Sequence, residues 1–230
     1  MAAVLFDFSG TLFRVETTES WLRAVLAGAG HTLPEPELTR TARALEAAGA
    51  LPGGVEPEEI PADLAELWAV RDQSAELHRA AYTGLSRRVA LPDAGLYDAL
   101  YDRHMTPAAW TPYPDSARVL RTLRDRGVGV GVVSNIGWDL RPVFREHGLD
   151  ACVDAYVLSR TSTGCRSPIH GCSRSPCEAL GADPRRVLMV GDNRAADGGA
   201  AALGCRVHFV DHLPTEHRPD ALLPVLDLVV

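Results

Sequence analysis

Several carboxylates and hydroxyls of this chain stand directly after short apolar runs, where they could attack or bind a ligand. Asp7 follows the apolar run that begins at Ala2 and precedes a tight turn through Gly10 and Thr11. An aspartate in such a place can act as a nucleophile toward an electrophilic centre. Taken alone, it is more typical of a strand end that caps the next turn.

Two further places have the same character. Ser134 and Asn135 follow an apolar run, and a hydroxyl and an amide there can hold a phosphoryl oxygen. The alternative is a helix N-cap, for which both residue types are preferred. Asp192 and Asp197 follow a later run, and two carboxylates on such a loop suit a hard cation such as Mg²⁺. The alternative is a Gly-Asp turn with a solvent-facing Asp197.

The elements that must position these residues alternate between strand and helix. Apolar runs predict strands, and the segments between them have helical periodicity and end at glycines. This alternation predicts an α/β fold, a doubly wound parallel sheet with helices on both faces. Ligands bind beyond the carboxyl ends of such strands. The predicted strands are 2–7, 128–134, 155–159, 186–192 and 207–211.

A long helical stretch interrupts this pattern. From about Phe13 to Pro107 the chain shows helix-period apolar positions and many breakers, but no comparable strand run. We interpret it as a helical insert between the first strand and the rest of the sheet. Trp21, Trp68 and Trp110 are expected to pack this insert and its hinge rather than to form a binding platform.

Composition limits the function classes. The chain has 230 residues, of which 46% are hydrophobic, and its net charge is −7. A dominant nucleic-acid or anionic-membrane binder would be basic, and no apolar run approaches the roughly 20 residues of a membrane span. The first residues lack the basic start of a signal peptide, and five cysteines form no disulfide framework. We expect a cytoplasmic protein that is a monomer or homodimer, with no nucleic-acid or membrane partner.

The combination of motifs is more specific than any one of them. Asp-x-x-Gly-Thr after the first strand, Ser-Asn after a middle strand and Gly-Asp-x-x-x-x-Asp after a later one occur in this order. The chain resembles the haloacid dehalogenase-like (HAD) hydrolase superfamily over its whole length. The resemblance implies a Rossmann-like α/β core over 1–13 and 108–230 and a helical cap over 14–107.

The resemblance also implies roles for single residues. Asp7 would be the nucleophile that forms an aspartyl intermediate, and Mg²⁺ would be the cofactor. Ser134 and Asn135 would hold the transferring group. The implied metal ligands are Asp7, the main-chain carbonyl of Ser9, Asp192 and Asp197. Three further site residues follow from position rather than from the resemblance. Gly10 and Thr11 would shape and hold the turn, and Arg14, just after it, would select the anionic or polar part of the substrate.

Two positions depart from the family pattern. Ser9 stands where phosphatases of this superfamily have a second Asp that protonates the leaving group. A serine hydroxyl is far too weak an acid for that task. The third family motif, commonly Lys-Pro-Asp-Pro, has no counterpart near Ser167. Arg166 is the nearby cation that could replace the lysine, although a solvated loop arginine is the more typical interpretation.

The composition offers an explanation for the missing motif. From Arg160 to Pro176 the chain is rich in Ser, Arg, Cys and Gly, whereas its flanks are rich in Ala, Leu and Val. We back-translated this segment with GC-rich codons and then read the same bases in a frame that starts one base earlier. The shifted frame encodes Val-Gln-Lys-Pro-Asp-Pro followed by the apolar residues of a helix start. We hypothesise that residues 160–176 are a frame-shifted reading of this motif, through a sequence error or a real double lesion. A zinc site is the alternative, although a paired Cys-x-x-Cys is absent. Its ligands would be Cys165, Cys172, Cys177 and His170.

The expected function is Mg²⁺-dependent hydrolysis of a small phosphorylated metabolite through an aspartyl-phosphate on Asp7. The alternatives are a haloacid-type dehalogenase, a phosphoryl-transfer enzyme such as a mutase, and a weakly active or inactive binding protein with the HAD fold. Ser9 and the altered third motif favour the last of these. The histidines near the C-terminus, His208, His212 and His217, are more typical of surface or packing residues.

Overall fold

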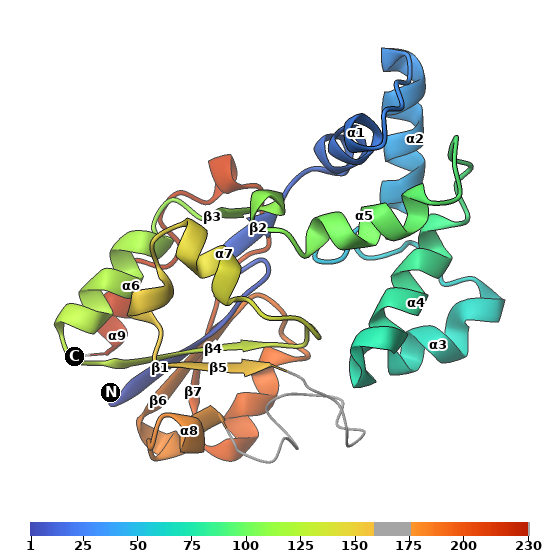
Figure 1. The fold of residues 1–230 in the computed structure, drawn as a ribbon. Coiled ribbons are helices and arrows are strands. Elements are labelled where there is room, and N and C mark those ends of the chain that lie inside the picture. The colour runs from blue at the N-terminus through green and yellow to red at the C-terminus, as the bar shows by residue number, and fades with distance from the viewer. Residues whose placement is uncertain (159–175, 230) are drawn as a thin grey trace.

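A five-stranded parallel sheet forms the centre of the protein (Figure 1). The computed structural model describes residues 1–158 and 176–229. A strand overlaps each of the five predicted runs, the last one beginning one residue before its run, so this part of the prediction is confirmed. In spatial order the strands are β5 (Ala155–Leu158), β4 (Gly129–Ser134), β1 (Ala3–Asp7), β6 (Val187–Gly191) and β7 (Arg206–Phe209).

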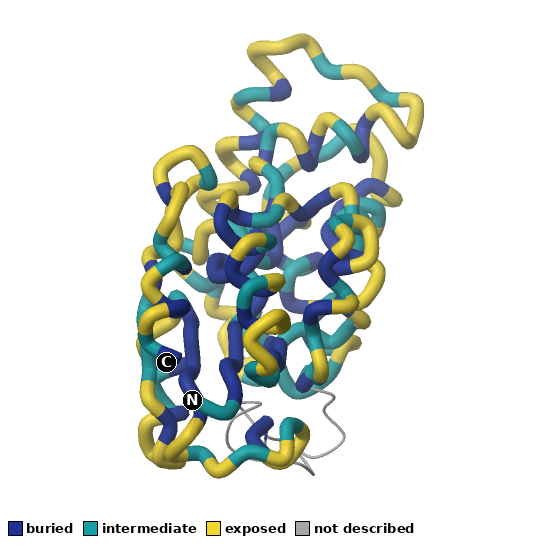
Figure 2. Tube along the Cα trace, turned by 90° about the vertical axis from the view of Figure 1, so that its left-hand side faces the viewer, coloured by how far each residue is buried: buried dark blue, intermediate teal, exposed yellow. Residues whose placement is uncertain are grey.

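The central strands are apolar throughout because both faces of the sheet are covered. In β1, Val4 and Phe6 belong to a large core cluster on one face, whereas Ala3 and Leu5 belong to a smaller cluster on the other. All four side chains are buried. Figure 2 shows the buried trace concentrated in this interior and the exposed trace on the outer turns. In the sequence, a strand of this kind appears as a continuous apolar run rather than as alternating apolar and polar residues.

Helices cover both faces, as the doubly wound arrangement requires (Figure 1). One face carries α6 (Ser116–Asp125), α7 (Arg141–Glu146) and α9 (Val225–Leu228). The other face carries α8 (Pro176–Ala179) and a 3₁₀ helix (Asp197–Leu203). The buried side of α6 consists of Val119, Leu120 and Leu123, the spacing from which the helix was predicted.

The remaining helices lie between two short strands, β2 (Phe13–Val15) and β3 (Trp110–Pro112), which pair antiparallel. Both connections to the rest of the protein pass through this ribbon. Three-residue strands are too short to have appeared as apolar runs in the sequence. The helices are α1 (Thr18–Gly28), α2 (Glu35–Ala47), α3 (Ala65–Val70), α4 (Ala75–Ser86) and α5 (Leu96–His104). Residues 18–104 are named the helical segment below. That residues 14–107 form a separate cap domain stays a prediction.

Buried side chains tie the helical segment together and to the sheet. The indole of Trp21 on α1 donates a hydrogen bond to the carbonyl of Leu100 on α5, at 2.8 Å. Trp21 belongs to the same core cluster as Phe8, the residue after Asp7. The hydroxyls of Thr17 and Ser74 cap α1 and α4 by accepting backbone N–H groups.

The helices are short. The longest described helix, α2, has 13 residues, whereas a membrane span needs about 20. Within residues 1–158 and 176–229, no helix has the length and apolar character needed to cross a bilayer.

Candidate active site

Three carboxylates meet at the carboxyl ends of β1 and β6. Asp7 ends β1, Asp192 follows β6, and Asp197 begins the 3₁₀ helix after that loop. One oxygen from each carboxylate lies within 4.8 Å of the others. The strand order reverses between β1 and β6, and this reversal is where ligands bind in open α/β sheets. The sequence prediction that these residues come together agrees with this geometry.

The three carboxylates disfavour one another's charge. Burial raises the pKa of Asp7 well above its usual range, and the charges of Asp197 and Asp192 raise it further. Burial, opposed by the backbone N–H of Asn193 and supported by Asp192, raises the pKa of Asp197 to about 7. A site in which carboxylates repel one another in this way gains stability from a cation. The oxygen donor set is the one that a hard divalent ion prefers.

Glycines allow this close approach. A Cβ on Gly191 would lie 2.0 Å from Oδ2 of Asp197. Gly10 has a φ of +76°, and a Cβ there would lie 2.3 Å from Oδ2 of Asp192. The turn after Asp7 and the loop after β6 can therefore pack against each other only with glycine at both places.

Two side chains hold Asp192. Thr11 donates its hydroxyl to Oδ1 of Asp192 at 3.3 Å. His212 Nδ1 lies 2.6 Å from Oδ2 of the same carboxylate. The sequence analysis interpreted His212 as a surface or packing residue and so missed this contact. The available signal was position, because His212 follows the carboxyl end of β7, the neighbour of β6.

Arg218 stabilises the turn after Asp7 through hydrogen bonds to its backbone. Its guanidinium donates to the carbonyls of Gly10 and Thr11, and it stacks on the ring of Tyr113 at 3.2 Å. Arg218 is 3% exposed, so these bonds are shielded from water. Sequence reasoning did not find this residue, because nothing in its local pattern marks it.

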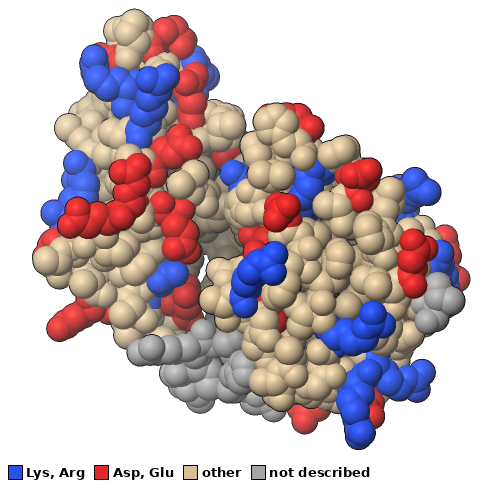
Figure 3. Space-filling view, turned by 180° about the vertical axis from the view of Figure 1, so that it is seen from behind, with Lys and Arg blue, Asp and Glu red and all other residues tan. Residues whose placement is uncertain are grey.

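The carboxylates face a cavity of about 660 Å³ between the sheet and the helical segment. Its size is within the range of ligand pockets, about 300–1,000 Å³. Ser134 and Asn135 line it, because β4 pairs with β1 in the register Asp7 to Val133. From behind, the surface is hollowed between the two parts of the molecule, and acidic side chains gather along the helical part (Figure 3).

Other predicted residues take different places. Ser9 and Arg14 line the cavity, and each has a buried polar atom, Oγ of Ser9 and Nη1 of Arg14, without a hydrogen-bond partner among the described residues. Gly10 and Thr11 support Asp192 as described. Arg166, the altered third motif and the cysteine cluster from Cys165 to Cys172 lie outside the described residues. The chain contains no lysine, so any cationic side chain of the site is an arginine or a histidine.

The helical segment supplies the opposite wall of the cavity. Trp68, Arg71, His78, Tyr82 and His104 line it, together with Trp110 of β3. Trp68 and Trp110, which were expected to pack the insert and its hinge, also border the cavity. Trp110 also packs as expected, being 3% exposed and bonded through its indole to the carbonyl of His104 at 2.7 Å.

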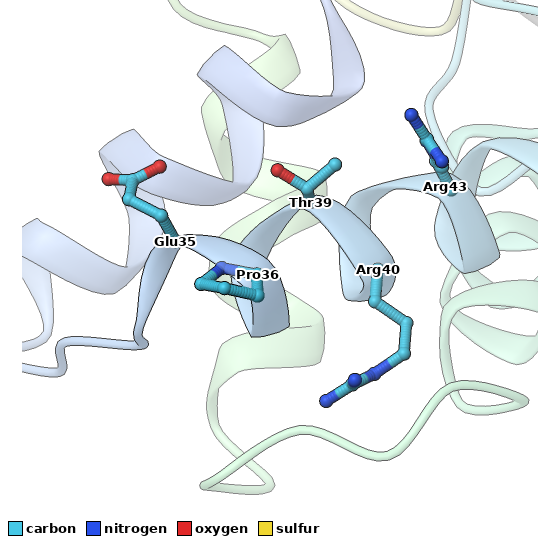
Figure 4. Close-up of a pocket in the computed structure, with 5 residues that line it drawn as sticks. All are labelled: Glu35, Pro36, Thr39, Arg40 and Arg43. Carbon is cyan, nitrogen blue, oxygen red and sulfur yellow. The ribbon is translucent and has the colours of Figure 1, made fainter.

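A second hollow, of about 540 Å³, lies along α2 (Figure 4). Its lining residues all come from that one helix. Glu35 is already paired with Arg23 at 2.7 Å. No described carboxylate cluster borders it, so the cavity beside Asp7 is the candidate site. The lining residues of the hollow on α2 are Glu35, Pro36, Thr39, Arg40 and Arg43.

Comparison with known proteins assigns the family. A family model described as haloacid dehalogenase-like hydrolase matches residues 1–204. The chain belongs to the haloacid dehalogenase-like hydrolases. Membership confirms the resemblance drawn from the motifs and makes the protein a hydrolase of this family. The matched range contains Asp7, Asp192 and Asp197, whereas His212 and Arg218 lie beyond it.

Relatives differ in what they are described to do. The chain is 29% identical over 162 residues to haloacid dehalogenase-like hydrolase domain-containing protein 3 of Mus musculus, covering 62% of this chain and 64% of that protein. Among solved structures, a predicted phosphoglycolate phosphatase from Haemophilus somnus is 16% identical with a TM-score of 0.55, covering 99% of this chain and 98% of that one. L-2-haloacid dehalogenase from Xanthobacter autotrophicus is 21% identical with a TM-score of 0.59, covering 100% and 84%. At these identities the structures show the shared fold.

Proposed function

We propose that this HAD hydrolase is a Mg²⁺-dependent phosphatase that acts on a small phosphorylated metabolite through an aspartyl-phosphate on Asp7. The observation that carries the proposal is the meeting of Asp7, Asp192 and Asp197 within 4.8 Å at one end of the cavity. A hydrolase that displaced halide with Asp7 alone would need one carboxylate, whereas a cluster of three, in which the pKa values of Asp7 and Asp197 are raised, favours a bound cation.

The residues present fit Mg²⁺. Asp7, Asp192 and Asp197 would hold it, and the backbone carbonyl of Ser9 would join them by family resemblance. Bound there, the ion would neutralise the repulsion between the nucleophile and an anionic phosphate. Thr11 and His212 orient Asp192 through their hydrogen bonds, which fixes the donor set in place.

The chain's own residues carry the rest of the reaction. An oxygen of Asp7 attacks phosphorus, the bond from phosphorus to the ester oxygen breaks, and the leaving group departs with the electron pair. Water then hydrolyses the aspartyl-phosphate and restores Asp7. Ser134 and the Asn135 amide line the cavity beside Asp7 and would orient the phosphoryl oxygens. The helical segment would exclude water from the closed site.

A haloacid dehalogenase is the second candidate, and Ser9 favours it. Without a carboxylate at position 9, no neighbouring acid assists an alcohol leaving group, whereas halide needs no proton. Metal dependence separates the two functions, because displacement of halide by Asp7 requires no cation.

The test is hydrolysis of a panel of phosphorylated metabolites and of 2-chloropropionate, each with Mg²⁺ or with EDTA. We expect phosphate release that needs Mg²⁺ and disappears in Asp7→Asn. Asp125→Asn is the matched control, since Asp125 is exposed at the end of α6. Chloride release in the presence of EDTA, with no phosphate release in Mg²⁺, would replace the phosphatase by the dehalogenase.

A further inference from the structure

An unbroken series of aromatic rings runs from the far end of the cavity to the nucleophile. It starts on α3, crosses α4 and α5, and returns through β3 to the residue after Asp7. Consecutive ring centroids are 5.2, 4.6, 6.1, 5.8, 6.3 and 4.5 Å apart. In order, the rings are Trp68, Tyr82, His78, His104, Trp138, Trp110 and Phe8. Five of these seven rings border the cavity, and we call these five the aromatic wall. They are Trp68, His78, Tyr82, His104 and Trp110.

The two imidazoles of the wall are uncharged at neutral pH. Burial lowers the pKa of His78 to about 4, and Arg71 contributes in the same direction. Burial, with a further contribution from His78, lowers the pKa of His104 to about 3. Nδ1 of His104 donates to the carbonyl of Tyr101, so its Nε2 keeps a free lone pair with no partner among the described residues. The imidazoles of the wall are therefore neutral, and His104 keeps one unfilled acceptor.

At the far end of the cavity, Arg71 lies near two carboxylates, those of Asp72 and Glu56. The Arg71 guanidinium lies over Trp68 at 3.9 Å and donates to the Trp68 carbonyl at 2.9 Å. Asp72 is paired with Arg71 at 3.8 Å and also borders the cavity. An arginine that is already paired with a carboxylate makes a weak site for a second anion. The far end therefore favours a neutral, flat group over a second acidic one.

At position 9, beside the nucleophile, the cavity lacks a proton donor of suitable strength. Ser9 is too weak an acid, and neutral imidazoles hold no acidic proton. Among the described lining residues outside the carboxylate cluster, burial also raises the pKa of Tyr82 to about 12. A leaving group that departs as a stable anion needs no such donor. Phenols ionise near pH 10, far more readily than alkyl alcohols.

We propose that the substrate is a phosphate monoester of an aromatic alcohol, with its ring packed on the aromatic wall and its phosphate at Asp7. This inference rests on the proposed function and names its substrate class. An oxygen of Asp7 forms the new bond to phosphorus as the bond to the aryl oxygen breaks. The aryl oxide leaves with the electron pair and is protonated by water. The cavity of about 660 Å³ accommodates both groups.

Three substrates test the proposal with the full chain and Mg²⁺. Phenyl phosphate has a ring and a good leaving group, cyclohexyl phosphate has similar size and a poor one, and acetyl phosphate has a good leaving group and no ring. We expect kcat/KM for phenyl phosphate to exceed that for cyclohexyl phosphate by about 100-fold or more. Equal rates for these two esters would overturn the claim about the leaving group.

Variants of the wall test the contact with the ring. Trp68→Leu and Tyr82→Leu should each lower the ratio of kcat/KM for phenyl phosphate to that for acetyl phosphate by about 3- to 10-fold. Tyr82→Phe should retain the ratio, which separates loss of the ring from loss of the hydroxyl. Tyr97→Leu is the matched control, because Tyr97 lies on α5 and contacts the Val89 carbonyl rather than the cavity. A ratio that is unchanged in both leucine variants refutes the ring contact.

Binding without turnover separates this inference from the proposed function. Calorimetry with Mg²⁺ should show phenylphosphonate binding more tightly than methylphosphonate, with the preference reduced in Tyr82→Leu. If acetyl phosphate is not hydrolysed but the preference for phenylphosphonate is present, the catalytic proposal is wrong and the ring site stands. If acetyl phosphate is hydrolysed and the two phosphonates bind equally, the ring site is wrong and the phosphatase stands.

Discussion

Replacing Asp197 by asparagine should make the metal-free protein less sensitive to pH. In the folded protein the pKa of Asp197 is raised to about 7, whereas the usual value for an aspartate side chain, which we take for the unfolded chain, is 3.8. Each pKa unit corresponds to about 1.4 kcal/mol between the two protonation states. The folded state thus binds more protons than the unfolded state between these values. The stability contribution is present at low pH and is lost as pH rises through about 7.

The magnitude follows from the pH window. Between pH 5 and pH 7 the folded protein keeps the Asp197 proton while the unfolded chain has lost it, which amounts to about 3 kcal/mol. The charge of Asp197 also raises the pKa of Asp7. Removing that charge therefore reduces the pH dependence of stability that comes from Asp7 as well as the part that comes from Asp197 itself. Wild type should therefore lose about 3 kcal/mol more than Asp197→Asn when the pH rises from 5 to 8.

Two buried histidines act in the opposite direction and must be separated. The lowered pKa values of His78 and His104 make the folded state bind fewer protons, so their contribution grows as pH rises from about 4 to 6.5. Both histidines are present in wild type and in the variant. Their contribution therefore cancels in the difference between the two proteins, which isolates the carboxylates.

The assay is urea unfolding in EDTA at several pH values, followed by circular dichroism. Asp125→Asn, exposed on α6, should show the same pH dependence as wild type. At pH 8, Mg²⁺ at 100 times its dissociation constant should restore about 2.7 kcal/mol to wild type and less to Asp197→Asn. Parallel stability curves for wild type and Asp197→Asn in EDTA would refute the reasoning, because they would show that Asp197 titrates as an ordinary surface carboxylate.

Four further outcomes are expected. Gly191→Ala should cost about 1–3 kcal/mol in urea unfolding, since its Cβ would lie 2.0 Å from Asp197, whereas Gly28→Ala, with open space around it, should change stability by less than about 1 kcal/mol. His212→Ala should weaken Mg²⁺ binding by about 10-fold or more in calorimetry, and exposed His217→Ala should not. Arg218→Met should cost about 2–5 kcal/mol, because the buried carbonyls of Gly10 and Thr11 lose their donor, and Arg218→Lys should cost less. Resequencing the codons for 155–180 should restore Lys-Pro-Asp-Pro, whereas unchanged bases would exclude a sequence error and mean that the motif is lost in the gene itself.

The sheet and its carboxylates were predictable for one physical reason. A parallel strand buried on both faces must be apolar throughout, so each strand stood out, and the residue after it marked the ligand-binding edge. Asp7 and Asp192 were found in this way. The ribbon of β2 and β3 was not, because three residues carry no periodic pattern. His212 escaped because the same rule was not applied to the end of β7.

Long-range contacts were the other limit. The rings of the aromatic wall come from helices α3 to α5 and from β3, and no spacing along the chain reveals that they face one cavity. Their partners are fixed by the packing of helices, for example the bond from Trp21 to Leu100. Trp68 was therefore assigned to packing, the more common role of a tryptophan, although it borders the cavity. Sequence patterns identify residues that act at strand ends better than residues that act from helix faces.

The segment after β7 completes the site although it lies beyond the range that the family model matches. That range ends at residue 204, yet His212 bonds to Asp192 and Arg218 bonds to the turn after Asp7. The ring of Tyr113 lies under Arg218, and its hydroxyl donates to the Leu213 carbonyl at 2.7 Å, which fixes this segment against the core. The geometry of the nucleophile loop thus depends on contacts about 200 residues away in sequence. Variation in this segment can tune the carboxylates without altering any family motif.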